Sequence, residues 1–403
     1  MGCEYGLSRS SLAGSEVREL LFRGKFADVE ALSRGDADAV RSVLGASLRH
    51  RLSRLPCREH RVALVFGGNG FVGAHLVARL SREPGIEQVW VAGRAMGEGG
   101  VEQRFDKTVA RYAVSGAERS KIRWVEATPT RVRFGLTEAA YGELAGEVDL
   151  VFNCASSSDY SASYLELRDD WVLSLLRVLQ FATEGRRKHL TYMGSLSSYF
   201  YQQPEDFRRP DSWWYSGYAQ MKWVNGRILQ HLSSELPLTL CESPYVLGAT
   251  DVGLDPGLTY SWWRVIEIAR SLGLIWDGPG MGYVPVDVLV DCLVVNALQA
   301  MPQSRLLPRN PVPYRNGLLA ELLDAELVSW EEFLAEAERR IPVRRIGSAL
   351  SENPNRLVEI VNEPSVVMPE VCWSPELDNR RLLELYLSKV PFRNIARPAE
   401  LSA

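Results

Sequence analysis

The feature that most constrains the fold of this chain is the stretch at residues 61–73, which reads RVALVFGGNGFVG. Its first half is a run of mostly branched or aromatic apolar residues, typical of a strand buried on both faces of a parallel sheet. Gly68, Gly70 and Gly73 follow with G-x-G-x-x-G spacing, and residues 74–81 continue as an amphipathic helix. Such glycines permit a tight turn, let a pyrophosphate approach the backbone, and let the helix pack closely on the strand. The stretch predicts a dinucleotide-binding strand-turn-helix unit, with an ordinary glycine-rich turn as the alternative.

The composition excludes several classes of protein. Of the 403 residues, 46% are hydrophobic and 24% are charged, and the net charge of −4 is ordinary for a soluble globular protein and unlike a nucleic-acid binder. We find no run of about eighteen uncharged apolar residues and no basic-then-apolar leader, so we expect a cytoplasmic protein without a membrane span. The six cysteines and five histidines are dispersed, so neither a disulfide framework nor a metal site is expected.

Beyond the first unit, apolar runs alternate with helical patterns. Strands are expected at residues 88–94, 121–127, 147–155, 189–194 and 238–242, and helices at residues 164–183 and 217–235. This alternation predicts an α/β fold with a Rossmann-type doubly wound parallel sheet. Ligands of such sheets lie beyond the carboxyl ends of the strands, so the residues after each apolar run are candidates for the site.

The second apolar run ends in Arg94, about twenty positions past the glycine loop. An acidic residue at this place holds the ribose 2′-hydroxyl of NAD, whereas an arginine accommodates the 2′-phosphate of NADP. Arg94 therefore favours NADP(H), and Arg104 could form the other side of a phosphate clamp, although an exposed arginine often has no such role.

Three regions are expected along the chain. Residues 1–60 form a helical N-terminal extension, in which Asp36 would be the N-cap of a helix over residues 36–55. Residues 61–250 form the NADP-binding Rossmann domain. Residues 251–403 form a mostly helical, smaller substrate-binding region, from which the chain returns to the Rossmann domain near residues 283–300. The proline-rich stretch at residues 302–313 is interpreted as a connector.

Two of the strand-end positions carry chemistry. Ser195 follows the strand that begins near His189, and Tyr218 and Lys222 lie four residues apart near the start of a helix, where they share one face. A cation beside a phenol favours the phenolate, which brings the tyrosine pKa toward a value useful for proton transfer. A Tyr-x-x-x-Lys pair alone is a weak signal, but it becomes specific when joined to the glycine loop and a strand-end serine.

These motifs together resemble the extended short-chain dehydrogenase/reductases. Among them the chain looks like the thioester reductase domains that end nonribosomal peptide synthetases, some polyketide synthases and carboxylic acid reductases, with fatty acyl-CoA reductases as neighbours. The resemblance covers roughly residues 62–300 and rests on residues 67–73, 133–136, 148–155, 164–168, 217–224, 243–248 and 283–287.

The resemblance implies roles for individual residues. Ser195 would take the catalytic Ser/Thr position, Tyr218 would be the proton donor, and Lys222 would be its partner and hold the nicotinamide ribose. NADPH would be bound by a set of loop and strand-end residues, namely Gly67, Gly68, Asn69, Gly70, Phe71, Val72, Gly73, Arg94, Arg104, Asn153, Cys154, Ala155, Lys222, Pro244, Tyr245 and Val246.

The chain departs from the family pattern at two positions. Thr128 stands where the family usually has an Asp that reaches the adenine, and Trp171 stands where it usually has an Asn that supports a proton relay. A separate alternative concerns Cys154, which lies near the predicted cofactor and could act as a covalent nucleophile. We expect instead that it is a small buried residue, because no activating histidine lies near it in sequence.

The function expected from this resemblance is a stand-alone NADPH-dependent thioester reductase of secondary-metabolite biosynthesis, which releases an acyl or peptidyl chain as an aldehyde or alcohol. The partner would be an acyl or peptidyl carrier protein in trans, or coenzyme A, with basic clusters at residues 186–188, 208–209 and 339–345 as candidate contacts or plain solvated faces. The alternatives are a nucleotide-sugar epimerase or dehydratase and a non-catalytic NADP-binding scaffold. The acyl group, the choice of carrier and the oligomeric state do not follow from the sequence.

Overall fold

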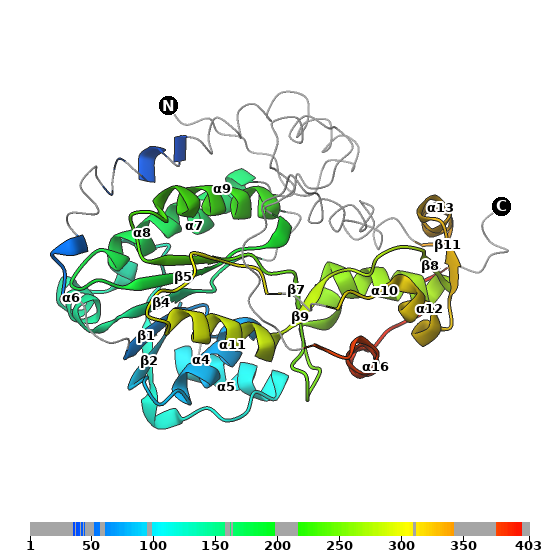
Figure 1. Cartoon of the computed structure of the whole chain (residues 1–403), viewed down its shortest axis with the longest axis horizontal. Helices are drawn as coiled ribbons and strands as arrows, with labels where there is room; N and C mark the ends of the chain where they lie inside the picture. Colours follow the sequence, from blue (N-terminus) through cyan, green and yellow to red (C-terminus); the bar gives the residue numbers. More distant parts are fainter. Residues whose placement is uncertain are drawn as a thin grey trace.

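The computed structural model describes residues 35–36, 38–40, 42, 44, 52–56, 61–94, 99–157, 162, 164–197, 217–308, 312–341 and 376–396. Its centre is a seven-stranded sheet in which every paired neighbour is parallel, in the order β10-β6-β5-β4-β1-β2-β3 (Figure 1). This confirms the predicted Rossmann-type doubly wound fold. The strands are β1 Val62–Phe66, β2 Gln88–Gly93, β3 Ile122–Glu126, β4 Leu150–Asn153, β5 His189–Met193, β6 Leu238–Cys241 and β10 Arg305–Leu306.

Helices cover both faces of the sheet because the central strands are apolar on both sides, and β1 and β5 are buried along their whole length. One face carries α4 Phe71–Ser81, α5 Val101–Tyr112 and α11 Val286–Ala297 (Figure 1). The other carries α6 Glu138–Glu147, α7 Tyr164–Trp171, α8 Leu173–Ala182 and α9 Gly217–Leu232. Within the described ranges, no helix is both long and apolar enough to cross a membrane.

The described part of the N-terminal region packs on the face that carries α7. Val40, Leu44 and Leu52 are buried in the same core as α8 and α9. Asp36 is not the predicted N-cap, because both Asp36 and the preceding Gly35 are already helical. It accepts hydrogen bonds from the Tyr164 hydroxyl at 2.9 Å and from Nε of Arg168 at 2.7 Å. A buried carboxylate gains more from an arginine and a phenol than from capping, so this tertiary contact decides its role.

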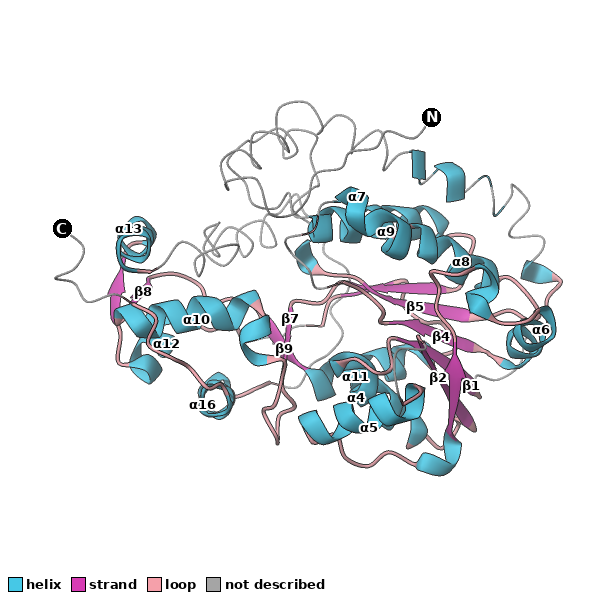
Figure 2. Ribbon diagram, turned by 180° about the vertical axis from the view of Figure 1, so that it is seen from behind, coloured by secondary structure: helices cyan, strands magenta, loops and turns pink. Residues whose placement is uncertain are grey.

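A second, smaller group of elements lies beside the sheet (Figure 2). It has its own apolar core and consists of α10 Ser261–Leu272, β8 Leu274–Trp276, α12 Asn316–Leu323, β11 Glu326–Val328, α13 Trp330–Arg340 and α16 Asn379–Lys389. The parallel pair β7 Tyr245–Leu247 and β9 Tyr283–Pro285 joins it to the Rossmann unit. The chain then returns through α11 and β10. The interpretation of residues 302–313 as a mere connector was wrong, since β10 lies within that stretch and pairs with β6.

Candidate active site

The glycine loop between β1 and α4 is a turn that only glycine can form at two positions. Gly67 has a φ of +78°, in the left-handed region, and its carbonyl accepts a 2.9 Å hydrogen bond from the Gly70 amide. A Cβ at Gly73 would lie 2.1 Å from the Gly67 oxygen, so the helix approaches the turn more closely than any side chain allows. The loop also meets the end of β4, because a Cβ at Gly67 would lie 2.7 Å from the Ala155 nitrogen. The close packing predicted for this turn is therefore present.

Three predicted cofactor residues meet beyond the end of β2. The Arg104 guanidinium donates a hydrogen bond to the Arg94 carbonyl, and both Arg104 and the Asn69 amide approach Gly93 closely. Both polar atoms of the Asn69 side chain, and Nε of Arg104, are buried without a hydrogen-bond partner in the described part of the chain. Because buried polar groups are normally paired, these atoms point to a polar ligand that supplies the missing partners.

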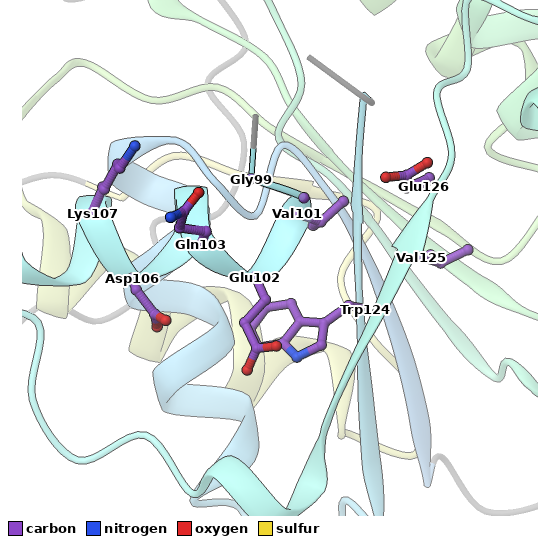
Figure 3. Close-up of a pocket in the computed structure, with 10 residues that line it drawn as sticks. Gly99, Val101, Glu102, Gln103, Asp106, Lys107, Trp124, Val125 and Glu126 are labelled. Carbon is purple, nitrogen blue, oxygen red and sulfur yellow. The ribbon is translucent and has the colours of Figure 1, made fainter. Parts of the chain in front are cut away.

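A cavity of about 760 Å³ lies beside this cluster, between the first turns of α5 and the edge strand β3 (Figure 3). Its wall includes Gly100 at the start of α5, Glu102, Gln103 and Trp124, and Glu126 closes it at the end of β3. The sequence analysis did not find this cavity. Glu126, an acidic residue near the end of the third predicted strand, was the available signal; in the structure it ends β3 and pairs in register with Gly93.

The loop after β3 explains how the chain accommodates a threonine in place of an aspartate. The Thr128 hydroxyl lies 3.0 Å from the Thr130 hydroxyl, and the Thr128 amide donates to the Phe134 carbonyl at 3.0 Å. The Phe134 ring packs edge-on against Phe66 at 4.9 Å between ring centroids, which anchors the loop to the end of β1. Thr128 thus pairs within its own loop.

The predicted catalytic pair comes together at the carboxyl end of β5. Nζ of Lys222 donates a 2.7 Å hydrogen bond to the carbonyl of Met193, the last residue of that strand, and lies 5.7 Å from the centre of the Tyr218 ring. Burial lowers the pKa of Lys222 to about 8, and the nearby Cys154 and Cys241 oppose that change. A lysine with such a pKa titrates close to neutrality, which suits it to assist a tyrosine in proton transfer.

Ser195 lies two residues beyond Met193, on the segment that continues β5. Its Oγ accepts hydrogen bonds from the Ser197 hydroxyl at 2.9 Å and from the Ser197 amide at 3.2 Å. The segment is tied to the end of β6, because the Gly194 amide donates to the Cys241 carbonyl at 2.7 Å. Ser195 is half-buried, and so is Tyr218, as expected for groups that a substrate must reach.

The remaining predicted residues lie at neighbouring strand ends. Oδ1 of Asn153 accepts a 3.3 Å hydrogen bond from the Ala155 amide, which orders the turn after β4. Burial raises the pKa of the Cys154 thiol to about 12, and the nearby charge of Lys222 opposes this change. Pro244 precedes β7, which contains Tyr245 and Val246, and the Tyr245 hydroxyl lies 3.0 Å from the Ser261 hydroxyl.

Two residues of the Lys222 environment were not predicted. The Tyr192 ring lies 5.2 Å from Nζ of Lys222, and Nδ2 of Asn225 donates a 2.8 Å hydrogen bond to the Tyr192 hydroxyl. The signal for Asn225 was its position three residues after Lys222, on the same face of one helix. Tyr192 could not be singled out from the sequence, because aromatic residues are common in apolar strands.

Comparison with known proteins decides the family. A family model described as "Male sterility protein" matches residues 65–293, more than half of the chain. The chain belongs to this family. One relative in sequence is the L-2-aminoadipate reductase of Saccharomyces cerevisiae. The two proteins are 24% identical over 349 aligned residues, which cover 78% of this chain and 24% of the relative. The chain spans about a quarter of the length of the curated relatives it matches.

Solved structures agree with the fold. The terminal R domain of the myxalamid PKS-NRPS pathway superposes with a TM-score of 0.68 at 19% identity, covering 90% of this chain and 96% of that one. A thiolation-reductase di-domain from an archaeal nonribosomal peptide synthetase gives a TM-score of 0.64 at 16% identity, covering 88% and 82%. These structures share the fold of this male sterility protein family member, and the matching family model is that of an NAD-binding domain.

The residues present fit a dinucleotide of the NAD(P) type, which the family binds. The backbone of the glycine loop leaves no room for side chains, and the orphaned atoms of Asn69 and Arg104 require polar partners. In this family member the loop would hold the pyrophosphate, and Lys222 would hold the nicotinamide ribose.

Proposed function

We propose that the protein is an NADPH-dependent thioester reductase that releases an acyl or peptidyl chain from a carrier as an aldehyde. The observation that supports this most directly is the buried Lys222, which is fixed by the Met193 carbonyl and lies beside the Tyr218 ring. Such a pair performs proton transfer at a carbonyl oxygen, and its position at the ligand side of the sheet matches that task.

A dinucleotide held by the glycine loop would supply the hydride that the thioester carbonyl carbon receives. Ser195 and Tyr218 donate hydrogen bonds to the carbonyl oxygen, on which negative charge develops. Tyr218 then gives its proton to that oxygen, and the charge of Lys222 stabilises the phenolate that remains. The product is a hemithioacetal, which loses the thiol of the carrier and leaves an aldehyde. A second round of the same chemistry would give the alcohol.

The preference for NADPH over NADH is part of this proposal. Arg94 follows directly after β2, and the Arg104 guanidinium donates to its backbone carbonyl, so both arginines lie in the segment that would receive an NADP 2′-phosphate. The Arg94 side chain is exposed and can adapt to a ligand.

We also propose that the acyl chain arrives on a carrier protein in trans or on coenzyme A. One support is the fold shared with a domain that is joined to a thiolation domain in its own protein. Within the basic cluster at residues 186–188, Lys188 is buried and Arg186 pairs with the buried Asp149 at 2.9 Å, so Arg187 is the exposed member. Arg208 and Arg209 lie outside the described residues, as do residues 342–345, whereas Arg339 pairs with Glu336 on α13.

The test is NADPH oxidation, followed by the loss of its near-ultraviolet absorbance, with acyl-CoA, acyl-pantetheine and acyl carrier protein as substrates. We expect thioester-dependent oxidation that prefers NADPH and falls about 10²- to 10⁴-fold in Tyr218→Phe. Thiol release and aldehyde capture establish the product. NADPH binding without turnover of any thioester would contradict the proposal and favour a scaffold, while turnover of a nucleotide sugar would favour an epimerase or dehydratase.

A further inference from the structure

Asn225 is fully buried in α9, three residues beyond Lys222, and its carboxamide joins three elements of the fold. Nδ2 donates one 2.8 Å hydrogen bond to the Trp171 carbonyl at the end of α7 and another to the Tyr192 hydroxyl on β5. A carbonyl can only accept, so the amino side of the carboxamide must face Trp171, and the orientation of the group is fixed.

The Trp171 carbonyl needs this donor because of a break between two helices. The α7 helix ends at Trp171 and α8 begins at Leu173. In a continuous helix the Leu175 amide would bond to Trp171, but here it donates to the Val172 carbonyl at 3.1 Å. Asn225 therefore supplies a donor to a helix-end carbonyl that lacks the Leu175 amide as its partner.

The second partner, Tyr192, links Asn225 to the catalytic pair. Its hydroxyl is held by Asn225, and its ring lies 5.2 Å from Nζ of Lys222. That ammonium group in turn contacts the Tyr218 ring at 5.7 Å and the Met193 carbonyl at 2.7 Å. A contiguous chain of contacts thus runs from the α7–α8 break through Asn225 and Tyr192 to Lys222 and Tyr218.

We propose that Asn225 is a positioning residue, which holds Tyr192 against Lys222 and thereby fixes the ammonium group beside Tyr218. This inference rests on the proposed function for its catalytic consequence, but the contacts themselves do not. The families that the chain resembles carry an asparagine where this chain has Trp171. Here the backbone carbonyl of Trp171 receives a hydrogen bond from a carboxamide on α9, that of Asn225.

The test compares Asn225→Ala and Asn225→Asp with Asn296→Ala. Asn296 is a matched control, since it is also buried and its Nδ2 also joins two acceptors, Oγ1 of Thr239 on β6 at 3.0 Å and the Gln303 carbonyl before β10 at 3.2 Å. We expect the Asn225 variants to lower kcat about 10- to 100-fold, with the dissociation constant of NADPH, measured by fluorescence, changed less than about threefold. Asn296→Ala should lower thermal stability and leave kcat of the folded protein unchanged.

A double-mutant cycle separates positioning from a general loss of packing. If Asn225 acts through Tyr192, the double variant Asn225→Ala with Tyr192→Phe should lose about as much kcat as the more damaging single variant. Additive losses, or a loss of kcat in Asn225→Ala no larger than that in Asn296→Ala, would overturn the proposal.

A measurement without turnover keeps this inference independent of the proposed function. The titration of Tyr218 can be followed by NMR with ¹³C-labelled tyrosine, the signal being assigned by its loss in Tyr218→Phe. Release of Lys222 should raise the midpoint of Tyr218 by about half a pH unit or more in Asn225→Ala. An unchanged midpoint overturns the positioning role, whether or not thioesters prove to be substrates.

Discussion

The two ends of the candidate site differ in how their predicted ligand-binding side chains are paired within the described residues. At the β5 end, the Lys222 ammonium already has its partner, the Met193 carbonyl, and lies between the Tyr192 and Tyr218 rings. At the β2 end, both amide atoms of Asn69 and Nε of Arg104 are buried without partners in the described residues. The predicted catalytic lysine is therefore held by the protein itself, in a preorganised position, whereas the predicted cofactor residues at the β2 end have hydrogen bonds still to gain from a ligand.

The largest effect should come from adding a side chain at Gly73, where α4 lies against the backbone of the glycine loop. In Gly73→Ala the new Cβ would meet the Gly67 oxygen at 2.1 Å and two further backbone carbons at 2.7 Å, so no side-chain movement can relieve the clash. We expect NADPH binding to fall at least about 100-fold in a fluorescence titration, with a lower Tm.

Gly142→Ala is the control for this variant. Gly142 also lies inside a helix, α6, but a Cβ there would meet nothing within 4 Å. Alanine should stabilise that helix by about 0.5–1 kcal/mol and leave NADPH binding unchanged. Normal NADPH affinity in Gly73→Ala would show that the turn is not the cofactor site.

The next largest effect should come from replacing Lys222 at the β5 end. Lys222→Met should lower kcat about 10²- to 10³-fold, because the phenolate of Tyr218 loses its cation. The pKa of Lys222 is lowered in the folded state, so the unfolded chain binds more protons between about pH 8 and pH 10.5, and the buried charge lowers folding stability below that window. The variant should therefore keep or raise the wild-type Tm at pH 7, which separates a catalytic loss from unfolding.

The pH dependence of the wild type follows from the same lysine. Below about pH 8 Lys222 is charged and kcat should be constant, and above it kcat should fall as the ammonium loses its proton. In Lys222→Met this alkaline limb should disappear from the pH profile of kcat. An identical limb in wild type and variant would assign it to another group.

The sequence could predict what depends on local pattern. The strands of the sheet follow from apolar runs such as residues 62–66, and the glycine turn follows from its spacing, because a turn of this shape tolerates few other residues. Tyr218 and Lys222 could be paired because four residues on a helix always bring two side chains to one face.

The remaining features depend on partners that are distant in sequence. Lys188 reads as part of a basic surface cluster, yet it is buried and donates to backbone carbonyls such as that of Ala145 at 2.9 Å. Asp36 has the local pattern of an N-cap, yet it binds Arg168. Asn225 gains its role only from the break at Trp171. No local pattern reports such contacts, because each is created by the packing of two elements.

Variants at the β2 end should change the affinity for NADPH more than the affinity for NADH. In Arg94→Ala and Arg104→Ala we expect the NADPH dissociation constant to rise about 10-fold or more, since each removes a cation from the 2′-phosphate, while NADH affinity changes little. Fluorescence titrations with both cofactors measure this directly. Arg123→Ala is the control, because Arg123 is exposed and its hydrogen bonds are to the local Ser120 and Ile122 carbonyls. Equal losses for NADPH and NADH would mean that these arginines do not read the phosphate.

The smallest effect should come from Cys154→Ala, although Cys154 lies close to the β5 end. A thiol attacks a thioester only as its thiolate, and burial raises the pKa of Cys154 to about 12, so almost none is ionised at neutral pH. The nearby Lys222 charge opposes that rise but does not overcome burial. We therefore expect kcat to change less than about twofold and intact-protein mass spectrometry to find no acyl adduct with acyl-CoA. A folded Cys154→Ala protein without activity would instead assign the chemistry to a covalent intermediate on this cysteine, and Tyr218 would then serve only to protonate it.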